Sequence, residues 1–443
     1  MWRKYTVKRN TKNRLAYNKA VQNCRSALYD NQIKTELKIL SNPDLGKFYR
    51  YVNAKLSCKT GIAPLLNNDN EYVFSNSNKA DLLNDFFTSV CTVDNNVMPV
   101  FETKTSNSNL NTIVFTRQRV LTNIKKSKNS MSSGPDGIPT LFFKKLQNCL
   151  SGPISVLFQI IFDSGECPTI WKHAYVIPVF KKGQSSRVEN YRPISLTCVL
   201  CKFFESVIKL DLSEYLAQNN ILNDAQHGFL SRHSTCTNLL ESINDWSLNI
   251  KNGHHSRIIF IDFAKAFDTV CHSKLLYKMS RLGIDGKLLR MLSSYLNCRT
   301  QQVLLDGALS DTKRVISGVP QGSVLGPLFF LIYINDFVEV LPKTIISKLF
   351  ADDAKLYTEM KGDLDADYLQ TGLDNLCKWA KKWQLKISYN KCFSMDVGLK
   401  RTQQPYPDHS IDGVLLSSVN ECRDLGVIVD NKLHFTTLLG NGC

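Results

Sequence analysis

Three aspartates have the residue type and spacing of groups that bind metal ions during phosphoryl transfer. Asp262 closes the apolar run of RIIFIDF (257–263), and Asp352 and Asp353 follow ninety residues later in SKLFADDAKLY. Carboxylate oxygens suit Mg²⁺, which usually keeps positions open for water and substrate phosphate. Two such ions about 3.5–4 Å apart can clamp the attacking and leaving oxygens of an in-line displacement. These residues therefore predict a two-metal site, provided that the two segments lie side by side.

The elements around these aspartates must bring them together. The continuous apolar run before Asp262 is typical of a buried strand. Apolar residues on both sides of Asp352 and Asp353 predict a hairpin that has the two carboxylates at its turn. Either piece alone has a simpler explanation, since Asp-Asp pairs are common in solvated turns and an Asp at a strand end often caps a helix. Strand and hairpin as neighbours in one sheet would place all three carboxylates at its edge.

The rest of the chain predicts an α+β fold. After Ser132, short strands alternate with longer helices, and Gly/Pro-rich turns separate them. Residues 364–383 place leucines and tryptophans at helical spacing, which predicts a helix that covers a sheet. VIPVFKKG predicts an edge strand, since Pro178 cannot donate to a ladder. Together these patterns indicate an antiparallel sheet backed by helices. Before this region, we expect a helix over Lys79 to Val90 and a polar linker over 93–112.

The charge of the chain is concentrated at its start. The 443 residues contain 55 Lys and Arg against 39 Asp and Glu, a net charge of +16. Residues 1–60 alone hold fourteen basic and three acidic residues, with interleaved aromatic residues. The pattern predicts helix over 12–57, with a break at Asn42-Pro43. Cations and aromatic rings suit a nucleic-acid backbone and its bases, while a solvated basic helix or a localisation signal is the other interpretation.

The composition excludes several protein classes. A hydrophobic content of 43% excludes a wholly disordered chain. No apolar run reaches the roughly 18 residues that span a bilayer, so we expect no membrane partner. No signal peptide is visible, so we expect an intracellular protein, nuclear and/or cytoplasmic and not secreted, whose fourteen cysteines are reduced. Cys198 and Cys201 have no second pair to complete a zinc site, and we interpret them as buried thiols.

The motifs resemble those of a known family. FIDFAKAFDTV, SGVPQGSVLGPLFFLIYINDF and KLFADDAKLY, in this order and spacing, resemble the first three palm motifs of reverse transcriptases of non-LTR (LINE-like) retrotransposons, especially the Jockey-like group. WKHAYVIPVFKKG and NYRPISLT resemble the fingers motifs, and QHGFLSRHSTCTNLL resembles the segment that joins fingers to palm. WQLKISYNKCFSM and CRDLGVIVDNKLHF resemble the later palm motifs. FYRYVNAKLSCKTGIAPL resembles the leader segment that precedes the polymerase in these elements. The resemblance covers about residues 45–436.

The resemblance implies a right-hand polymerase with fingers and palm. We expect a basic helical leader and linker at 1–120, a reverse transcriptase domain at 121–436 (fingers about 121–255, palm about 256–436), and a tail at 437–443. Family members carry an endonuclease before the polymerase and a helical thumb after it. Residues 1–60 are too few for an endonuclease, and the chain stops eight residues after Phe435. We therefore expect no endonuclease and a truncated thumb.

The implied activity is RNA-directed DNA polymerisation. The enzyme would add dNTPs to a DNA primer 3′-hydroxyl on an RNA template, using two Mg²⁺ ions, with Mn²⁺ as the alternative. Asp262 and Asp352 match the aspartates that bind both ions, Asp353 completes the carboxylate set, and the Phe263 carbonyl matches the backbone ligand. Lys391 matches the lysine that donates a proton to the leaving pyrophosphate. Protein partners are not implied.

The resemblance also implies residues that hold the nucleotide. Lys181 or Lys182, with Lys181 preferred, matches one half of the triphosphate clamp, and Arg192 matches the other. Phe267 matches the ring that lies under the sugar and excludes a 2′-hydroxyl, which favours dNTPs, although a core phenylalanine is the alternative. Gln321 and Gly322 match the loop that contacts the incoming nucleotide and template, or else form a turn into the next helix. Arg299 matches a template- or primer-side position.

Two other functions remain open from the sequence. The chain could be a catalytically inactive, nucleic-acid-binding remnant of a decayed element, in which the fold persists without turnover. A group II intron-type reverse transcriptase with a maturase role ranks last. It would need a maturase segment after the palm, and we see none in the sequence.

Overall fold

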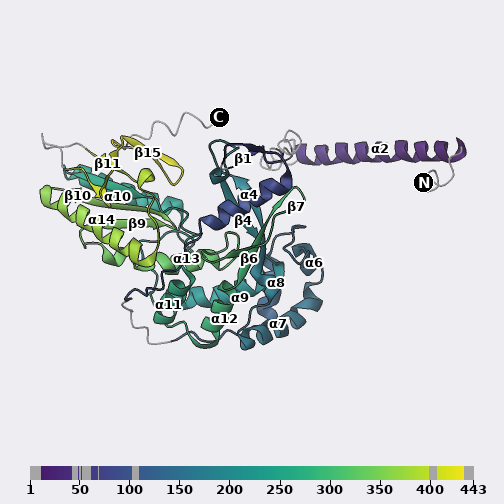
Figure 1. The fold of residues 1–443 in the computed structure, drawn as a ribbon, viewed down its shortest axis with the longest axis horizontal. Helices are drawn as coiled ribbons and strands as arrows, with labels where there is room; N and C mark the ends of the chain where they lie inside the picture. The colour runs from purple at the N-terminus through teal and green to yellow at the C-terminus, as the bar shows by residue number, and fades with distance from the viewer. Residues whose placement is uncertain are drawn as a thin grey trace. The chain divides into compact units, whose positions relative to one another are not determined.

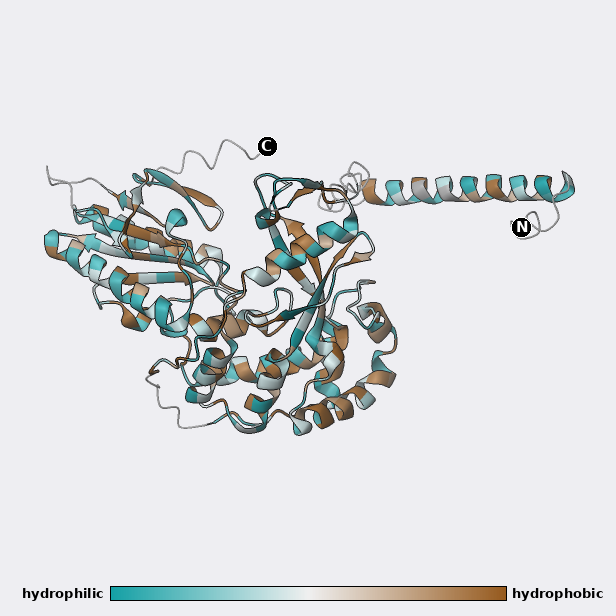
Figure 2. Ribbon diagram, viewed as in Figure 1, coloured by the Kyte–Doolittle hydropathy of each residue, from teal (hydrophilic) through white to brown (hydrophobic). Residues whose placement is uncertain are grey.

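The computed structural model describes residues 11–41, 48, 51, 61–67, 69–101, 109–398 and 407–433. The chain divides into two compact units, residues 1–63 and 64–443. The described part of the first unit is mainly helix α2 (Thr11–Leu40), which confirms the start of the expected helical segment. Most of its side chains are exposed on every face, and Figure 2 shows hydrophilic residues along its whole length. Asn42-Pro43 lies outside the described residues.

The boundary between the units follows Ala63, so residues 64–120, which the sequence pattern assigns to the leader and linker, fold with the second unit. Here β1 (Leu65–Leu66) pairs with β2 (Tyr72–Val73). Helix α4 (Asn76–Ser89) begins three residues before the expected start. Its buried Asn84 donates to the hydroxyl of Ser310 at 3.0 Å. Of the expected linker, residues 102–108 lie outside the described part, and Leu110 bridges to Ile284.

One sheet, the β3–β4 sheet, has the strand order β4-β3-β6-β7, with β8 also paired to β6. Its strands are β3 (His173–Phe180), β4 (Tyr191–Leu196), β6 (Arg299–Leu305), β7 (Ala308–Leu309) and β8 (Lys313–Val315). The prediction of an edge strand at β3 is wrong, because β3 lies between β4 and β6. The strand β6 pairs with only the first half of β3, up to Val176, so Pro178 faces β4 alone, where its partner is Pro193.

Helices pack around this sheet (Figure 1). They are α5 (Arg117–Lys126), α6 (Thr140–Lys145), α7 (Gln147–Ser164), α8 (Thr169–Lys172) and α9 (Val199–Gln218). Their core is aromatic: Phe115 stacks on Phe204 at 4.9 Å between ring centroids, and Phe158 and Trp171 complete the cluster. Cys198 and Cys201 are buried here, as expected, and burial raises the pKa of the Cys198 thiol to about 12.

A second sheet, the β5–β10 sheet, has the strand order β14-β11-β5-β10-β9. Its strands are β5 (His255–Ile261), β9 (Ile346–Phe350), β10 (Asp353–Met360), β11 (Phe393–Val397) and β14 (Ser417–Ser418). All neighbours are antiparallel except β11 and β14. The expected strand before Asp262 and the expected hairpin around Asp352 are both confirmed. The fold is therefore a mixture of helices and largely antiparallel sheet.

Helices also accompany the second sheet: α10 (Thr235–Lys251), α11 (His272–Arg281), α12 (Gly286–Leu296), α13 (Gly326–Ile334) and α14 (Asp363–Trp383). The predicted helix over 364–383 is confirmed, since α14 buries Leu369, Leu373 and Trp379 on one face. The apolar α13 is buried almost completely, and Figure 2 shows it in hydrophobic colours. Within the described residues, no helix is both long enough and apolar enough to cross a bilayer.

Two short hairpins follow the β5–β10 sheet. Their strands are β12 (Ser410–Ile411), β13 (Val414–Leu415), β15 (Glu421–Asp424) and β16 (Val427–Asp430). Short 3₁₀-helices lie at Val188–Asn190 (η1), Asn335–Val340 (η2) and Tyr389–Lys391 (η3). The tail at 437–443 lies outside the described residues.

Candidate active site

The three aspartates lie at one edge of the β5–β10 sheet. The last registered pair between β5 and β10 joins Ile261 to Ala354. Asp262 and Asp353 are the next residues on these two antiparallel strands, and Asp352 stands beside Asp353 in the turn between β9 and β10. Two segments that are ninety residues apart in the sequence therefore deliver their carboxylates to the same place, as the spacing of the motifs predicts.

The carboxylates influence one another strongly. Burial raises the pKa of Asp352, and the nearby charge of Asp262 raises it further. Burial and the charges of Asp352 and Asp262 raise the pKa of Asp353 to about 6, although that side chain still reaches solvent. Like charges in a partly desolvated place favour protonation unless a cation neutralises them. The donor set therefore fits a hard divalent cation, although no three His, Cys, Asp or Glu side chains in the described residues are already gathered around a metal position.

Asp262 has an ammonium partner and a fixed backbone. Lys391, in η3, donates from Nζ to Asp262 Oδ2 at 2.9 Å, and this lysine is 60% exposed. The carbonyl of Asp262 accepts the N–H of Ser388 at 2.8 Å. The next residue, Phe263, forms a bridge with Ile387, and its ring is buried. The segment after β5 is therefore held against the segment that carries Lys391, so both reach the same sheet edge.

A glutamine from a distant segment holds the turn of the β9–β10 hairpin. Gln226 Oε1 accepts the N–H of Ala351 at 2.9 Å, across 125 positions of sequence, and the N–H of Gly228 at 2.7 Å. The N–H of Leu349 donates to the carbonyl of Ala225 at 2.8 Å. Gly228 packs so closely that a Cβ there would lie 2.3 Å from the Ala351 nitrogen. The segment 225–228 thus acts as a brace for the residue that precedes Asp352.

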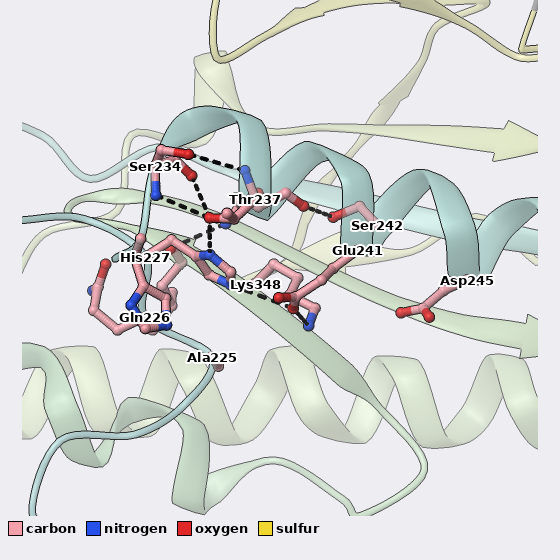
Figure 3. Close-up of polar contacts among 12 residues, drawn as sticks. Ala225, Gln226, His227, Ser234, Thr237, Glu241, Ser242, Asp245 and Lys348 are labelled. Carbon is pink, nitrogen blue, oxygen red and sulfur yellow. Dashed lines mark hydrogen bonds and ion pairs between the residues drawn. The ribbon is translucent and has the colours of Figure 1, made fainter. Parts of the chain in front are cut away.

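A buried histidine continues this brace into α10 (Figure 3). The N–H of His227 donates to the Leu349 carbonyl at 2.8 Å, and its ring Nδ1 lies 2.9 Å from the hydroxyl of Thr237. Glu241, which also pairs with Lys348 of β9, lies 3.4 Å from His227 Nε2. Burial lowers the pKa of His227. Sequence reasoning assigned no role to Gln226 or His227; the available signal was the Gln-His-Gly run, in which the glycine permits close backbone contact.

The glycine-rich loop is tied to the segment that follows Asp262. Gly318 donates to the carbonyl of Val270 at 2.8 Å and accepts from the ring of His272 at 2.7 Å. Its φ of +85° and its close approach to Asp268, where a Cβ would lie 2.7 Å from the carbonyl oxygen, explain the glycine. Gln321 donates from Nε2 to Asp268 Oδ1 at 2.8 Å. The loop is thus fixed against the expected metal-binding segment.

The other end of this loop contacts β4. The carbonyl of Gln321 accepts the N–H of Ser195 at 2.7 Å. Gly322 has a φ of +111° and is exposed, and a Cβ there would lie 2.7 Å from the Ser195 carbonyl oxygen. Gln321 and Gly322 therefore lie between the strand that carries Arg192 and the segment that follows Asp262.

Phe267 is partly buried on the same segment. Its ring stacks on Phe330 of α13, with centroids 4.4 Å apart, and meets the ring of Phe229 at 6.1 Å. The carbonyl of Phe267 accepts the N–H of Val319 at 2.8 Å. Phe267 thus packs against the core while it remains partly exposed.

Basic side chains face the carboxylates. Lys181 follows β3, and its N–H donates to the Asn190 carbonyl at 2.8 Å, which prolongs the β3–β4 ladder. Burial lowers the pKa of Lys181, and the charges of Arg192 and Lys391 lower it further, whereas Asp262 opposes them. Arg192 is exposed on β4. Lys181 and Lys182 are both exposed. The effect of Asp262 on the pKa of Lys181 favours Lys181 as the lysine that faces the aspartates.

Two other basic residues differ from the sequence-based expectations. Lys265, which sequence reasoning did not single out, lies over the ring of Phe86 at 5.0 Å, and burial together with the charges of Lys391 and Arg192 lowers its pKa. It therefore belongs to the same group of cations. Arg299 is 2% exposed and donates to the Tyr295 carbonyl at 3.1 Å. Its burial does not fit the expected contact with template or primer.

Comparisons with known proteins agree with the arrangement of these motifs. The RNA-directed DNA polymerase from mobile element jockey of Drosophila melanogaster is 32% identical over 296 residues, which cover 65% of this chain and 32% of the relative. The probable RNA-directed DNA polymerases from transposons BS and X-element of the same species are 28% and 29% identical, over 72% and 71% of this chain and 36% and 35% of the relatives. The chain thus spans about a third of the length of these relatives.

The model of the family described as reverse transcriptase (RNA-dependent DNA polymerase) matches residues 179–429. That match covers more than half of the chain and contains the aspartates, the lysines and the glycine-rich loop described above. The family implies a right-hand polymerase fold, with which the observed helices and antiparallel sheet agree. The chain belongs to the reverse transcriptase (RNA-dependent DNA polymerase) family, in the Jockey-like group of non-LTR retrotransposons.

Proposed function

We propose that this chain is an RNA-directed DNA polymerase that adds dNTPs to a primer 3′-hydroxyl by two-metal phosphoryl transfer. The observation that carries the proposal is the meeting of Asp262, Asp352 and Asp353 at one sheet edge, opposite the cations Lys181 and Arg192. Phosphoryl transfer depends mainly on positioning and on charge stabilisation, so carboxylates for cations on one side and cations for phosphates on the other are the groups that it needs.

The carboxylates would hold two Mg²⁺ ions, or Mn²⁺ ions in their place. Asp262 and Asp352 would bind both, with Asp353 and the Phe263 carbonyl as further ligands. Oxygen donors of this kind suit Mg²⁺, and the raised pKa values of Asp352 and Asp353 reflect a repulsion that divalent cations would relieve. When bound, the ions would activate the primer hydroxyl and stabilise the leaving oxygen.

The cations would hold the triphosphate. Arg192 can contact phosphate oxygens through two N–H groups at once, and Lys181 can act as a point charge. Lys391 already contacts Asp262, and its exposed ammonium could turn to the leaving pyrophosphate and donate a proton. Lys182, which is exposed on the same turn, would contribute mainly to the general positive field.

The sugar and the base would be selected by the neighbouring segment and loop. The ring of Phe267, supported by Phe330, would lie under the sugar and collide with a 2′-hydroxyl. Gln321 and Gly322 would present the loop to the incoming nucleotide and template, because the Gln321 carbonyl accepts from Ser195 and the Gln321 side chain donates to Asp268. Each of these roles needs a rigid support, which the hydrogen bonds of the loop supply.

RNA as template, and DNA as primer and product, are the proposed nucleic acids. The basic residues of positions 1–60 would add contact with the template backbone. Every described cysteine is a free thiol, which suits the reducing interior of a cell, whether nuclear or cytoplasmic.

Primer extension on poly(rA) with oligo(dT) tests the proposal. Wild-type protein should incorporate dTTP in the presence of Mg²⁺, and Asp352→Ala should abolish incorporation. Asp306→Asn, at an exposed turn that already has a positive φ, is the matched control and should extend like the wild type. Folded wild-type protein that binds the template but does not extend the primer would support the inactive, nucleic-acid-binding remnant instead.

A further inference from the structure

Glu205, on α9, is a carboxylate that is completely buried, and none of the proposed catalytic roles uses it. Neighbours on the same helix are buried as well: Phe203, Phe204 and Val207. A charge in such a place is costly unless hydrogen bonds and an opposite charge compensate for it. The partners of Glu205 therefore show what the charge is needed for.

These partners include two backbone N–H groups at the end of the glycine-rich loop. Oε2 of Glu205 accepts from the N–H of Val324 at 2.7 Å and from that of Leu325 at 3.0 Å. The two bonds span 119 and 120 positions of sequence. Oε1 accepts from the thiol of Cys201 at 3.3 Å. Hydrogen bonds to a charged acceptor are roughly twice as strong as neutral ones. The carboxylate thus ties α9 firmly to the loop that carries Gln321.

The start of α13 explains why such an acceptor is needed. The first N–H groups of a helix have no partner within the helix. Here Leu325 and Gly326 are buried, so their N–H groups need partners from the protein. Glu205 accepts the first, and the hydroxyl oxygen of Ser323 accepts the second at 3.0 Å. The negative charge of Glu205 also lies at the positive end of the helix dipole, which stabilises both.

The same contacts restrain Gln321, because the turn from Pro320 to Ser323 is closed on itself. The N–H of Ser323 donates to the Pro320 carbonyl at 3.0 Å, and its hydroxyl donates to the same carbonyl at 2.8 Å. Val324 follows this turn directly. An acceptor that holds Val324 therefore also holds the turn that presents Gln321, in addition to the hydrogen bonds that Gln321 makes itself.

Arg299 supplies an opposite charge. This residue is 2% exposed, and its guanidinium carbon lies 4.8 Å from the centroid of the Tyr295 ring. Burial raises the pKa of the Cys201 thiol, the charge of Glu205 raises it further, and the charge of Arg299 opposes the increase. The pKa of Tyr295 responds in the same way. Both charges therefore act on the same buried groups, and the burial that does not suit a template contact suits a counter-charge.

We propose that Glu205, balanced by Arg299, is a positioning residue that holds the glycine-rich loop in its nucleotide-binding position. The inference rests on the proposed polymerase function, because it takes the loop as part of the dNTP site. A loop that is only partly in the competent position binds its ligand with an affinity reduced by that fraction. Loss of the charged acceptor should therefore raise KM for dNTP more than it lowers kcat. The Mg²⁺ dependence should not change, since the aspartates stand on the β5–β10 sheet.

Primer extension with dTTP on poly(rA) tests this role. Glu205→Gln keeps the shape of the side chain but makes the acceptor neutral, and it should raise KM for dTTP about tenfold. Leu212→Ala is the control for stability, since Leu212 is buried on the same helix about two turns further on. Its cavity should lower the melting temperature and leave KM near the wild-type value. Equal increases of KM in both variants would show that lost stability alone is responsible and would overturn the proposal.

A double variant separates position from stability. Glu205→Gln alone leaves the guanidinium of Arg299 buried without its counter-charge, which should lower the melting temperature. Glu205→Gln with Arg299→Met removes both charges, and replacements of this kind are often neutral or stabilising. The double variant should therefore regain melting temperature but keep the raised KM for dTTP. Recovery of both would overturn the proposal. If Glu205→Gln does not fold, the double variant decides alone, and a wild-type KM would have the same consequence.

Amide hydrogen exchange follows the loop without catalysis. Peptides that cover residues 318–326 should exchange faster in the double variant than in the wild type, whereas peptides that cover 346–356, around the β9–β10 turn, should exchange alike. Unchanged exchange at 318–326 would overturn the inference even if primer extension is normal. Conversely, faster exchange there, in a protein whose wild type never extends a primer, would overturn the polymerase function and leave Glu205 as the anchor of the loop.

Discussion

Two turns face each other across the candidate active site, and they are built differently. The β9–β10 turn, with Asp352 and Asp353, is held by Gln226 from 125 positions away and stands on buried strands. The β3–β4 turn, with Lys181, is held mainly by its own neighbours: Lys181 donates to Asn190, and the Asn190 side chain donates to the carbonyl of Gln184 at 2.9 Å. Its one distant backbone partner among the described residues is Leu66, whose N–H donates to the Ser186 carbonyl at 2.9 Å. Groups that hold metal ions need fixed geometry, whereas cations that follow a flexible triphosphate can stand on a locally built, exposed turn.

The largest effect should come from the carboxylates themselves. Asp262→Asn should reduce primer extension by on the order of 10³-fold or more, because several kcal/mol of charge stabilisation are lost. The melting temperature should stay the same or rise, since one of three repelling carboxylates is removed. Extension and thermal unfolding of this variant and of Asp306→Asn check the prediction. A variant that loses extension only because it unfolds would contradict it.

The brace should matter for both stability and activity. Gln226→Leu removes the acceptor of two N–H groups, those of Ala351 and Gly228, and each buried group left unpaired costs about 1–3 kcal/mol. We expect a lower free energy of unfolding in denaturant titration and weaker extension by the folded fraction. Gln218→Leu, at an exposed position on α9, is the control and should change little. Equal stability of the two variants would show that the brace is not needed.

Selection of deoxyribose over ribose should depend on Phe267, whose ring stacks on Phe330. Phe267→Ala should lower the preference for dTTP over UTP by roughly 10- to 100-fold, as expected when a steric collision is removed from a pocket. The ratio of kcat/KM for the two nucleotides measures this preference. Phe142→Ala replaces an exposed phenylalanine and serves as the control. An unchanged ratio would identify Phe267 as a core residue that supports Phe330.

The smallest effect should come from the exposed turn. Lys181→Gln should raise KM for dNTP about tenfold, the equivalent of one charge-assisted hydrogen bond, with little change in stability. Lys182→Gln is the matched control, since Lys182 neighbours Lys181 and is exposed. Steady-state kinetics with dTTP separates the two. A larger increase in KM for Lys182→Gln would reverse the assignment and show that the turn presents the other lysine.

The sequence itself determined the local elements that carry the chemistry. The apolar run before Asp262, the hairpin around Asp352 and the helix over 364–383 follow from patterns within about twenty residues, and all three are present. Such patterns are informative because a strand that is buried on both faces is apolar throughout, whereas an amphipathic helix repeats its apolar residues with a fixed period. The glycines at 318 and 322 were also visible as loop signals, although the backbone atoms that they accommodate were not.

Only the tertiary structure decided how distant segments support one another. Three features depend on segments far away in the sequence: the role of Gln226, the burial of Arg299 and the central position of β3. A polar residue carries the same local signal whether it faces water or a backbone N–H, and burial alone makes a hydrogen-bond partner necessary. The aspartates could therefore be found from the sequence, while the residues that hold them in place could not.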